Sequence, residues 1–258
     1  MGLVFQNLLN AVGYDNAYEG ESSFIRKQFF GPESHDKGDL LTLRHVLEHI
    51  PNPWNFLDTL AEANEYKGCN YIEVPDLKWI LANHAFFDIF HEHVNYFQAS
   101  DFITRYGHSV VHSSTSFGGQ YLSIVIDLHA IQDLSPPLEA SEINHDFLVS
   151  VDRLSEFEQK TYQSLARKDD FVLWGAAAKG VVFASKVPLE IRKKMLYAID
   201  INPSKQGFYM PVSGVEVVGH LSGVHNLKPS SHVIIMNPNY EKEIRSLLPS
   251  NQPCSVLH

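Results

Sequence analysis

The sequence predicts an α/β fold, and three observations lead to this class. Short apolar runs end in polar or turn residues at 39–46, 71–74, 171–174 and 232–236. Stretches with helical periodicity separate many of these runs, and strands that alternate with helices form parallel sheets with crossover helices. The Pro-containing stretch IQDLSPPLEASE divides the pattern into two series. We therefore expect two α/β units, with a boundary near residues 130–150.

The first series predicts the following elements in chain order. We expect a helix over 2–12, a strand end and turn in GYDNAYEG, strands at 39–46 and 71–74, helices at 54–63 and 100–106 with Ser100 as the N-cap, and two strands at 109–116 and 120–128 joined through Gly118 and Gly119.

The second series begins with a long amphipathic helix. We expect this helix at 143–166, strands at 171–174, 194–199 and 232–236, a short apolar run at 214–218, helices after GAAAKG and at 240–248, and an edge strand at 254–257. The predicted organisation is a domain at 1–130, a linker and long helix at 131–168, and a second domain at 169–258.

Composition excludes several classes of protein. The formal charge of −10 argues against a nucleic-acid or anionic-membrane binder, because phosphate contact needs a basic surface. The two cysteines, Cys69 and Cys254, have no metal-binding spacing and predict no disulfide framework. No signal peptide and no membrane span are evident, so we expect a cytoplasmic protein.

Asp15 follows the first predicted strand end. In nucleotide-binding α/β folds, an acid at the end of the second strand accepts hydrogen bonds from ribose hydroxyls. The alternative is an Asx turn, because Asp-Asn is favourable turn chemistry.

Titratable residues follow the strand at 39–46 in RHVLEHI. Ligands of open α/β sheets bind at the carboxyl ends of strands, where Arg44 and His45 are expected. His45 and His49 also have the spacing of zinc ligands on a helix, but no suitable third ligand is evident, so we predict no metal site. The alternative is a loop network with satisfied hydrogen bonds.

HEHVNYF combines histidines with a carboxylate, Glu92. A histidine titrates near neutral pH, and a neighbouring carboxylate orients it or raises its basicity, which suits a general base. The aromatic residues around it either line a dry pocket or pack in an ordinary core. They are Phe86, Phe87, Phe90, Tyr96 and Phe97.

WGAAAKG is a strand-to-helix turn made of small residues. Such a turn lets phosphate approach the backbone amides at a helix N-terminus, and Lys179 adds positive charge. The alternative is a close contact between helix and strand. Asp200, after the next strand, stands where a nucleotide-contacting acid is expected, or in a Pro-containing turn.

The order of six motifs resembles the sugar C-methyltransferase family, which uses S-adenosylmethionine. The motifs are RHVLEHIPNPWNFL, YIEVPDLKWIL, FDIFHEHVNYFQASDF, WGAAAKG, IDINPSKQG and NPNYEKEI. The resemblance covers residues 10–248 and implies a class I methyltransferase domain followed by a second Rossmann-like α/β domain.

The resemblance also implies roles for named residues. Asp15 would meet the cofactor ribose, and Arg44 and His45 would lie near the cofactor. Glu92 and His93 match the active-site Glu-His pair, with His93 as the base. Substrate contacts fall to Asn95, Tyr96, Ala178 and Lys179, the last facing the phosphates of a nucleotide-linked sugar.

The chain departs from the family pattern at its N-terminus. The Cys-based zinc domain is absent, and the sequence begins after the expected first strand and Gly-rich loop, so we expect an incomplete methyltransferase sheet. A partner chain could supply the missing part.

The predicted function is C-methylation of a nucleotide-linked keto-sugar through base-assisted enolate formation. The first alternative is an inactive remnant that binds only the nucleotide sugar. A nicotinamide-dependent dehydrogenase is disfavoured, because the second unit lacks the glycine fingerprint.

Overall fold

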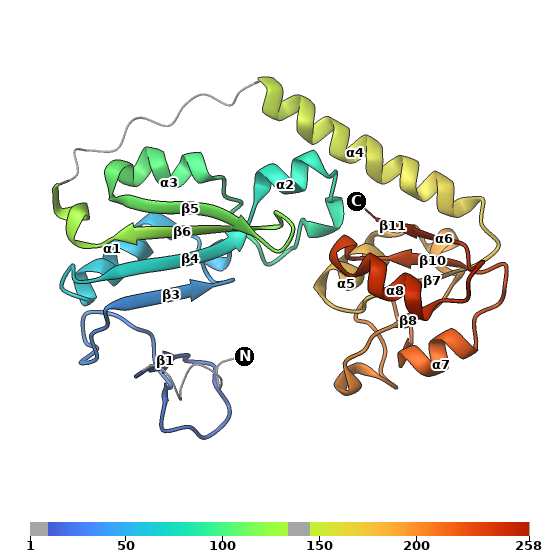
Figure 1. Ribbon diagram of the computed structural model, residues 1–258, viewed down its shortest axis with the longest axis horizontal. Coiled ribbons are helices and arrows are strands. Elements are labelled where there is room, and N and C mark those ends of the chain that lie inside the picture. The colour runs from blue at the N-terminus through green and yellow to red at the C-terminus, as the bar shows by residue number, and fades with distance from the viewer. Residues whose placement is uncertain (1–9, 134–144, 258) are drawn as a thin grey trace. The chain divides into compact units, whose positions relative to one another are not determined.

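The computed structural model describes residues 10–133 and 145–257, which form two compact units of α/β structure (Figure 1). Among the described residues, the first unit comprises 10–74, Phe97–Ser114 and 122–133. The second comprises Pro75–Tyr96, Thr115–Tyr121 and 145–257. The α/β class predicted from sequence is confirmed.

A four-stranded sheet in the order β3-β4-β6-β5 supports the first unit (Figure 1). β3 and β4 run parallel, and their register places Arg44 opposite Glu73. A separate parallel pair, β1 and β2, precedes this sheet. The strands are β1 (Gly13–Tyr14), β2 (Ile25–Arg26), β3 (Leu40–Arg44), β4 (Cys69–Pro75), β5 (Val110–Ser116) and β6 (Tyr121–Asp127).

Two α-helices of the first unit have clear start signals. α1 (Pro53–Ala63) begins with proline, whose fixed φ suits the first helical position. α3 (Ala99–Tyr106) is capped by Gln98, whose N–H donates to the Asp101 carboxylate at 2.7 Å. The predicted N-cap at Ser100 is wrong, because Asp101 completes a capping box with Gln98. The 3-10 helices of the first unit are η1 (Leu47–His49), η3 (Gly107–Ser109) and η4 (His129–Asp133).

The core of the first unit gathers around aromatic rings. Trp54 meets Phe97, Phe102 and Tyr106 edge-on, at centroid distances of 5.8, 5.4 and 6.1 Å. Edge-to-face geometry is the favourable arrangement for such rings. Phe97 therefore belongs to this core, as the core interpretation of the sequence expected.

The second unit contains a five-stranded parallel sheet in the order β11-β10-β7-β8-β9. Counted from β7 within the unit, this order is 3-2-1-4-5, the arrangement of a doubly wound α/β fold. Chain order reverses between β7 and β10, and ligands of such folds bind beyond the strand ends at this switch point. The strands are β7 (Phe171–Trp174), β8 (Met195–Ile199), β9 (Val217–Val218), β10 (His232–Ile235) and β11 (Cys254–Val256).

The helices of the second unit include the predicted long helix, α4. They are α2 (Leu77–Ala82), η2 (Phe86–Asp88), α4 (His145–Ala166), α5 (Ala178–Lys186), α6 (Leu189–Arg192), η5 (Pro203–Lys205), α7 (His220–His225), η6 (Pro238–Tyr240) and α8 (Glu241–Leu247).

Apolar clusters bury both faces of β7. Leu173 packs in one cluster and Val172 in the other, as expected for a central parallel strand. The first cluster also contains Phe86 and Phe87, which are 1% and 0% exposed. For these two rings the core interpretation holds, and the pocket-lining interpretation is wrong.

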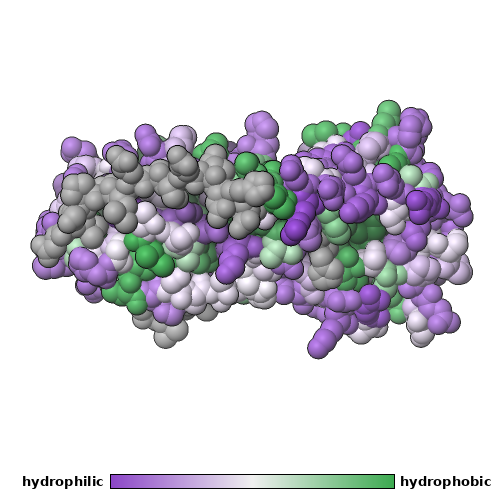
Figure 2. Space-filling model, turned by 90° about the horizontal axis from the view of Figure 1, so that it is seen from above, coloured by the Kyte–Doolittle hydropathy of each residue, from purple (hydrophilic) through white to green (hydrophobic). Residues whose placement is uncertain are grey.

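The face drawn in Figure 2 mixes many hydrophilic residues with small hydrophobic patches. No helix in the described part of the chain is long and apolar enough to cross a membrane. Both cysteines are free. The helix predicted at 2–12 falls mostly outside the described residues, and residues 10–12 are not helical.

Candidate active site

The turn after β7 stands at the switch point of the second unit. Gly175 has a φ of 116°, in the region that favours glycine, and a Cβ there would lie 3.2 Å from Cβ of Met236. A Cβ on Gly180 would lie 1.9 Å from the carbonyl oxygen of Gly175. The close contact between helix and strand, given above as the alternative, therefore accounts for Gly180, while the positive φ and the contact with Met236 account for Gly175.

Asp200 ties this turn to the end of β8. Its Oδ2 accepts the N–H of Ala176 at 3.0 Å and lies 3.2 Å from Nζ of Lys205. Its Oδ1 accepts the N–H of Asn202 at 2.9 Å. The carboxylate stabilises two loops, as its alternative role in a Pro-containing turn requires.

Lys179, the second residue of α5, forms a buried ion pair with Asp88. Nζ donates to Oδ2 of Asp88 at 2.7 Å and to Oε1 of Gln120 at 2.7 Å. The two charged side chains are only 16% and 7% exposed. Burial raises the pKa of Asp88, while the nearby Lys179 ammonium acts in the opposite direction.

The segment with the predicted base belongs to this second unit. His93 follows a turn at residues 91–92 and is half-buried, whereas Glu92 is exposed. The ring of Phe90 meets His93 edge-on at 4.6 Å, and the ring of Tyr96 lies 5.8 Å away. These contacts hold the imidazole among aromatic rings.

Tyr96 fixes the bend of this segment. Its hydroxyl accepts the N–H of Phe90 at 2.9 Å, which joins the two ends of the His91–Asn95 stretch. Burial raises the pKa of Tyr96, the bond from Phe90 lowers it, and Asp88 raises it further. The phenol of Tyr96 therefore stays protonated at neutral pH.

Asn95 and Ala178 belong to the same unit, and their contacts with the substrate remain predictions.

The predicted cofactor residues lie in the first unit. Asp15 is exposed directly after β1, and its Oδ1 accepts the N–H of Ala17 at 2.9 Å, which is the Asx turn considered as the alternative. Arg44 donates to Oε1 of Glu73 through Nε at 2.9 Å and Nη2 at 2.8 Å. Parallel pairing of β3 and β4 brings these two residues together.

His45 completes a polar cluster beyond β3. Its φ of 53° is uncommon for a residue with a side chain. Nδ1 lies 3.4 Å from Oε1 of Glu48, and Nε2 lies 3.6 Å from Oε1 of Glu73. Tyr71 donates to the other oxygen of Glu73 at 3.0 Å. The loop network that the sequence offered as an alternative is present here.

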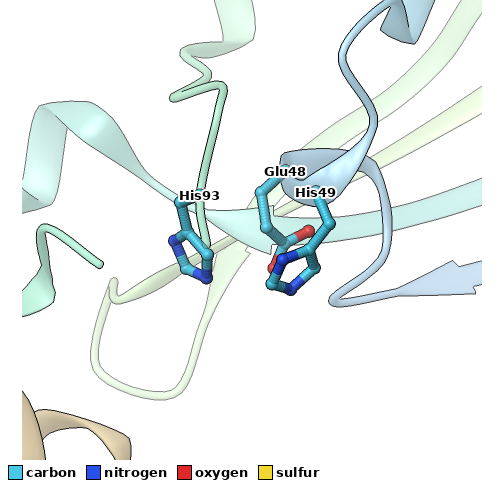
Figure 3. A group of neighbouring side chains, drawn as sticks. All are labelled: Glu48, His49 and His93. Carbon is cyan, nitrogen blue, oxygen red and sulfur yellow. The ribbon is translucent and has the colours of Figure 1, made fainter. Parts of the chain in front are cut away.

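Glu48 and His49 lie side by side on η1 (Figure 3). A carboxylate oxygen and an imidazole nitrogen of the pair lie within 4.8 Å. Figure 3 also draws His93, which belongs to the second unit. Two donors from one unit are fewer than a structural metal site uses.

Sequence reasoning missed Asp88, Gln120 and Glu73 as members of these networks. The signal for Glu73 was available, since it is a charged residue inside the buried run YIEV. Asp88 and Gln120 gave no comparable signal, because their partner Lys179 lies 91 and 59 positions away.

Comparison with models of protein families gives a match over part of the chain. Residues 3–107 match the family model of a methyltransferase domain. Proteins with class I domains of this kind generally use S-adenosylmethionine as the methyl donor. No curated protein matches the chain.

Proposed function

We propose that this chain is an S-adenosylmethionine-dependent methyltransferase that methylates a carbon atom of a nucleotide-linked keto-sugar. The methyltransferase domain supports the general activity. The sugar acceptor and the carbon target rest on the resemblance of the sequence motifs.

One observation carries the choice of acceptor chemistry. The segment with Glu92 and His93 and the switch-point turn with Ala178 and Lys179 belong to the same compact unit. A sheet of this order binds ligands beyond the ends of β7 and β10. A nucleotide sugar bound there would share one folded body with the proposed base.

In the proposed reaction His93 removes a proton from the carbon next to the sugar ketone. The electron pair of the broken C–H bond enters the enolate, and the proton moves to the imidazole. Tyr96 and Phe90 exclude water from one side of His93, which favours proton transfer from carbon. The enolate carbon would then form a bond to the methyl group of the donor while the bond between sulfur and that methyl group breaks. The electron pair of the broken bond would remain on sulfur, and S-adenosylhomocysteine would leave.

S-adenosylmethionine supplies an electrophilic methyl group on a sulfonium centre when it is bound. An exposed carboxylate at the end of β1 fits the ribose hydroxyls, so Asp15 would hold that part of the donor. Arg44 and His45 are less available for direct contacts with the donor, because Glu73 lies against Arg44 and Glu48 lies against His45. Their proposed role is to shape the electrostatic potential around the donor.

The test combines binding with turnover. S-adenosylhomocysteine and a nucleoside diphosphate sugar should each bind by calorimetry. His93→Gln should lower turnover by about 100-fold or more, with ligand affinities nearly unchanged. Full activity in this variant would remove His93 from the mechanism.

A binding-only protein is the second candidate, favoured by the internal pairing of Arg44 and His45. It predicts that the nucleotide sugar binds and that S-adenosylhomocysteine does not.

A further inference from the structure

We infer that Asp88 and Lys179 are a positioning pair, which fixes the segment carrying Glu92 and His93 against the switch-point turn of the second unit. The catalytic meaning of this inference rests on the proposed function. It assigns Lys179 a role other than the phosphate contact expected from the sequence.

The pair joins two parts of the unit that are far apart in sequence. Asp88 ends η2 and precedes His93 by five positions, and Lys179 lies in the first turn of α5. The 2.7 Å bond between them links these two elements directly. Phe86 adds a second link, because its carbonyl oxygen accepts from Nζ of Lys186 at 3.4 Å.

Neighbouring side chains already occupy most of the hydrogen-bonding capacity of the Lys179 ammonium. Gln120 accepts a second hydrogen bond from Nζ, and its own amide donates to Oδ1 of Asn237 at 3.3 Å. The rings of Trp79 and Phe87 lie 5.2 and 6.0 Å from the ammonium. A phosphate would have to displace Asp88 or Gln120 to reach a cation that is already neutralised.

The network also anchors the turn between β5 and β6. The carbonyl oxygen of Gln120 accepts the N–H of Asp76 at 3.0 Å, and Asn239 donates to the carbonyl oxygen of Phe117 at 2.9 Å. Gln120 is 2% exposed. The segment 79–88 and Gln120 therefore meet at the ammonium group of Lys179 on α5, and Asn237 joins this network through Gln120.

A buried ion pair is poorly suited to adding stability, because desolvation offsets much of the attraction. Its geometric demand is strict, since loss of either close partner leaves an uncompensated charge in the interior. A pair of this kind suits a segment whose position must be unique, as a catalytic base requires.

Hydrogen exchange of the full chain tests the inference without any substrate. Lys179→Met and Asp88→Asn should each speed amide exchange in residues 84–96 by about tenfold or more, with β7 and β10 little changed. Lys193→Met is the matched control, because it removes an exposed ion pair with Glu190 in the same unit. Unchanged exchange at 84–96 in both variants would overturn the inference.

Ligand binding separates positioning from phosphate contact. The positioning role predicts that both variants lower kcat to a similar extent and change the dissociation constant of a nucleoside diphosphate by less than about threefold. A phosphate contact predicts a loss of affinity of about tenfold or more in Lys179→Met alone, and that result would overturn the inference.

A double variant tests the inference even if the single variants, each with one unpaired charge, fail to fold. Asp88→Leu combined with Lys179→Met removes both charges together and leaves no unpaired ion. It should fold and still show fast exchange at 84–96, and native protection there would contradict the inference. If the wild-type chain transfers no methyl group, the proposed function fails, while the exchange result still decides whether the pair positions the segment.

Discussion

Gly180 is the residue at which substitution should be least tolerated in the switch-point turn. A Cβ at this position would lie 1.9 Å from the carbonyl oxygen of Gly175, a backbone atom that cannot rotate away. Gly180→Ala should therefore lower the free energy of unfolding by about 1–3 kcal/mol, through displacement of α5. Urea denaturation measures the loss. Gly31→Ala serves as control, because a Cβ there meets no atom within 4 Å, and an equal loss in both variants would contradict the packing argument.

His232 links stability to pH. Burial lowers its pKa, and Lys168 lowers it further. The unfolded chain then binds the proton more readily, so this contribution to stability is complete above the ordinary pKa of 6.5 and declines as pH falls toward the folded pKa. The free energy of unfolding should fall when the pH is lowered from about 7.5 to about 5.5, and His232→Gln should make this fall smaller. Urea denaturation at the two pH values measures the difference. A larger loss in the variant would reverse the sign and refute the assignment.

Local sequence patterns indicated some structural features around the candidate site, while the catalytic and binding roles stay predictions. The turn at Ala178 and Lys179 and the aromatic surroundings of His93 were recognisable from local sequence. The partner of Lys179 was not, because a single sequence carries no signal for an ion pair between residues 91 positions apart. Arg44 and Glu73 were closer to prediction, since parallel pairing of two neighbouring strands brings them together.

At the scale of elements, the segment from Pro75 to Tyr96 is part of a core. Phe87 is fully buried in the apolar cluster that contains Leu173 and Phe183. Phe87→Ala should cost about 3–5 kcal/mol of unfolding free energy, because it leaves a cavity among these side chains. Val94→Ala in the same segment should cost less than about 0.5 kcal/mol, since Val94 is 56% exposed. Equal costs in urea denaturation would mean that Phe87 lies outside the core.

Most strands and helices were predictable because their signals are local. β7 coincides with the predicted strand at 171–174. Pro53 occupies the first position of α1, where proline is favoured, and Gly118 and Gly119 adopt positive φ in the predicted turn between two strands. The N-cap of α3 escaped prediction because glutamine is not among the preferred N-cap residues, whereas Ser100 is. The reciprocal bond with Asp101 places the cap at Gln98. Burial of Phe86 and Phe87 depends on tertiary contacts, which cannot be predicted from the hydrophobic periodicity or the composition of the sequence.

At the scale of the whole molecule, compact units do not follow chain order. The second unit combines the C-terminal sheet with Pro75–Tyr96 and Thr115–Tyr121. These segments bring Phe86, Phe87 and Asp88 to elements more than 80 positions away. A parallel sheet of this kind needs both faces covered, and here one cover comes from an earlier part of the chain.

This arrangement predicts that the fragment 145–258 folds less well alone than within the full chain. The fragment would leave Leu173 and Phe183 without the rings of Phe86 and Phe87, and Lys179 without Asp88. We expect a less cooperative thermal transition at lower temperature, and binding of a hydrophobic dye that the full chain does not bind. Addition of a peptide spanning residues 75–96 should raise the midpoint, whereas the same peptide with Phe86 and Phe87 replaced by alanine should not. A fragment that unfolds as cooperatively and at the same temperature as the full chain would show that the sheet needs no cover from the earlier segment.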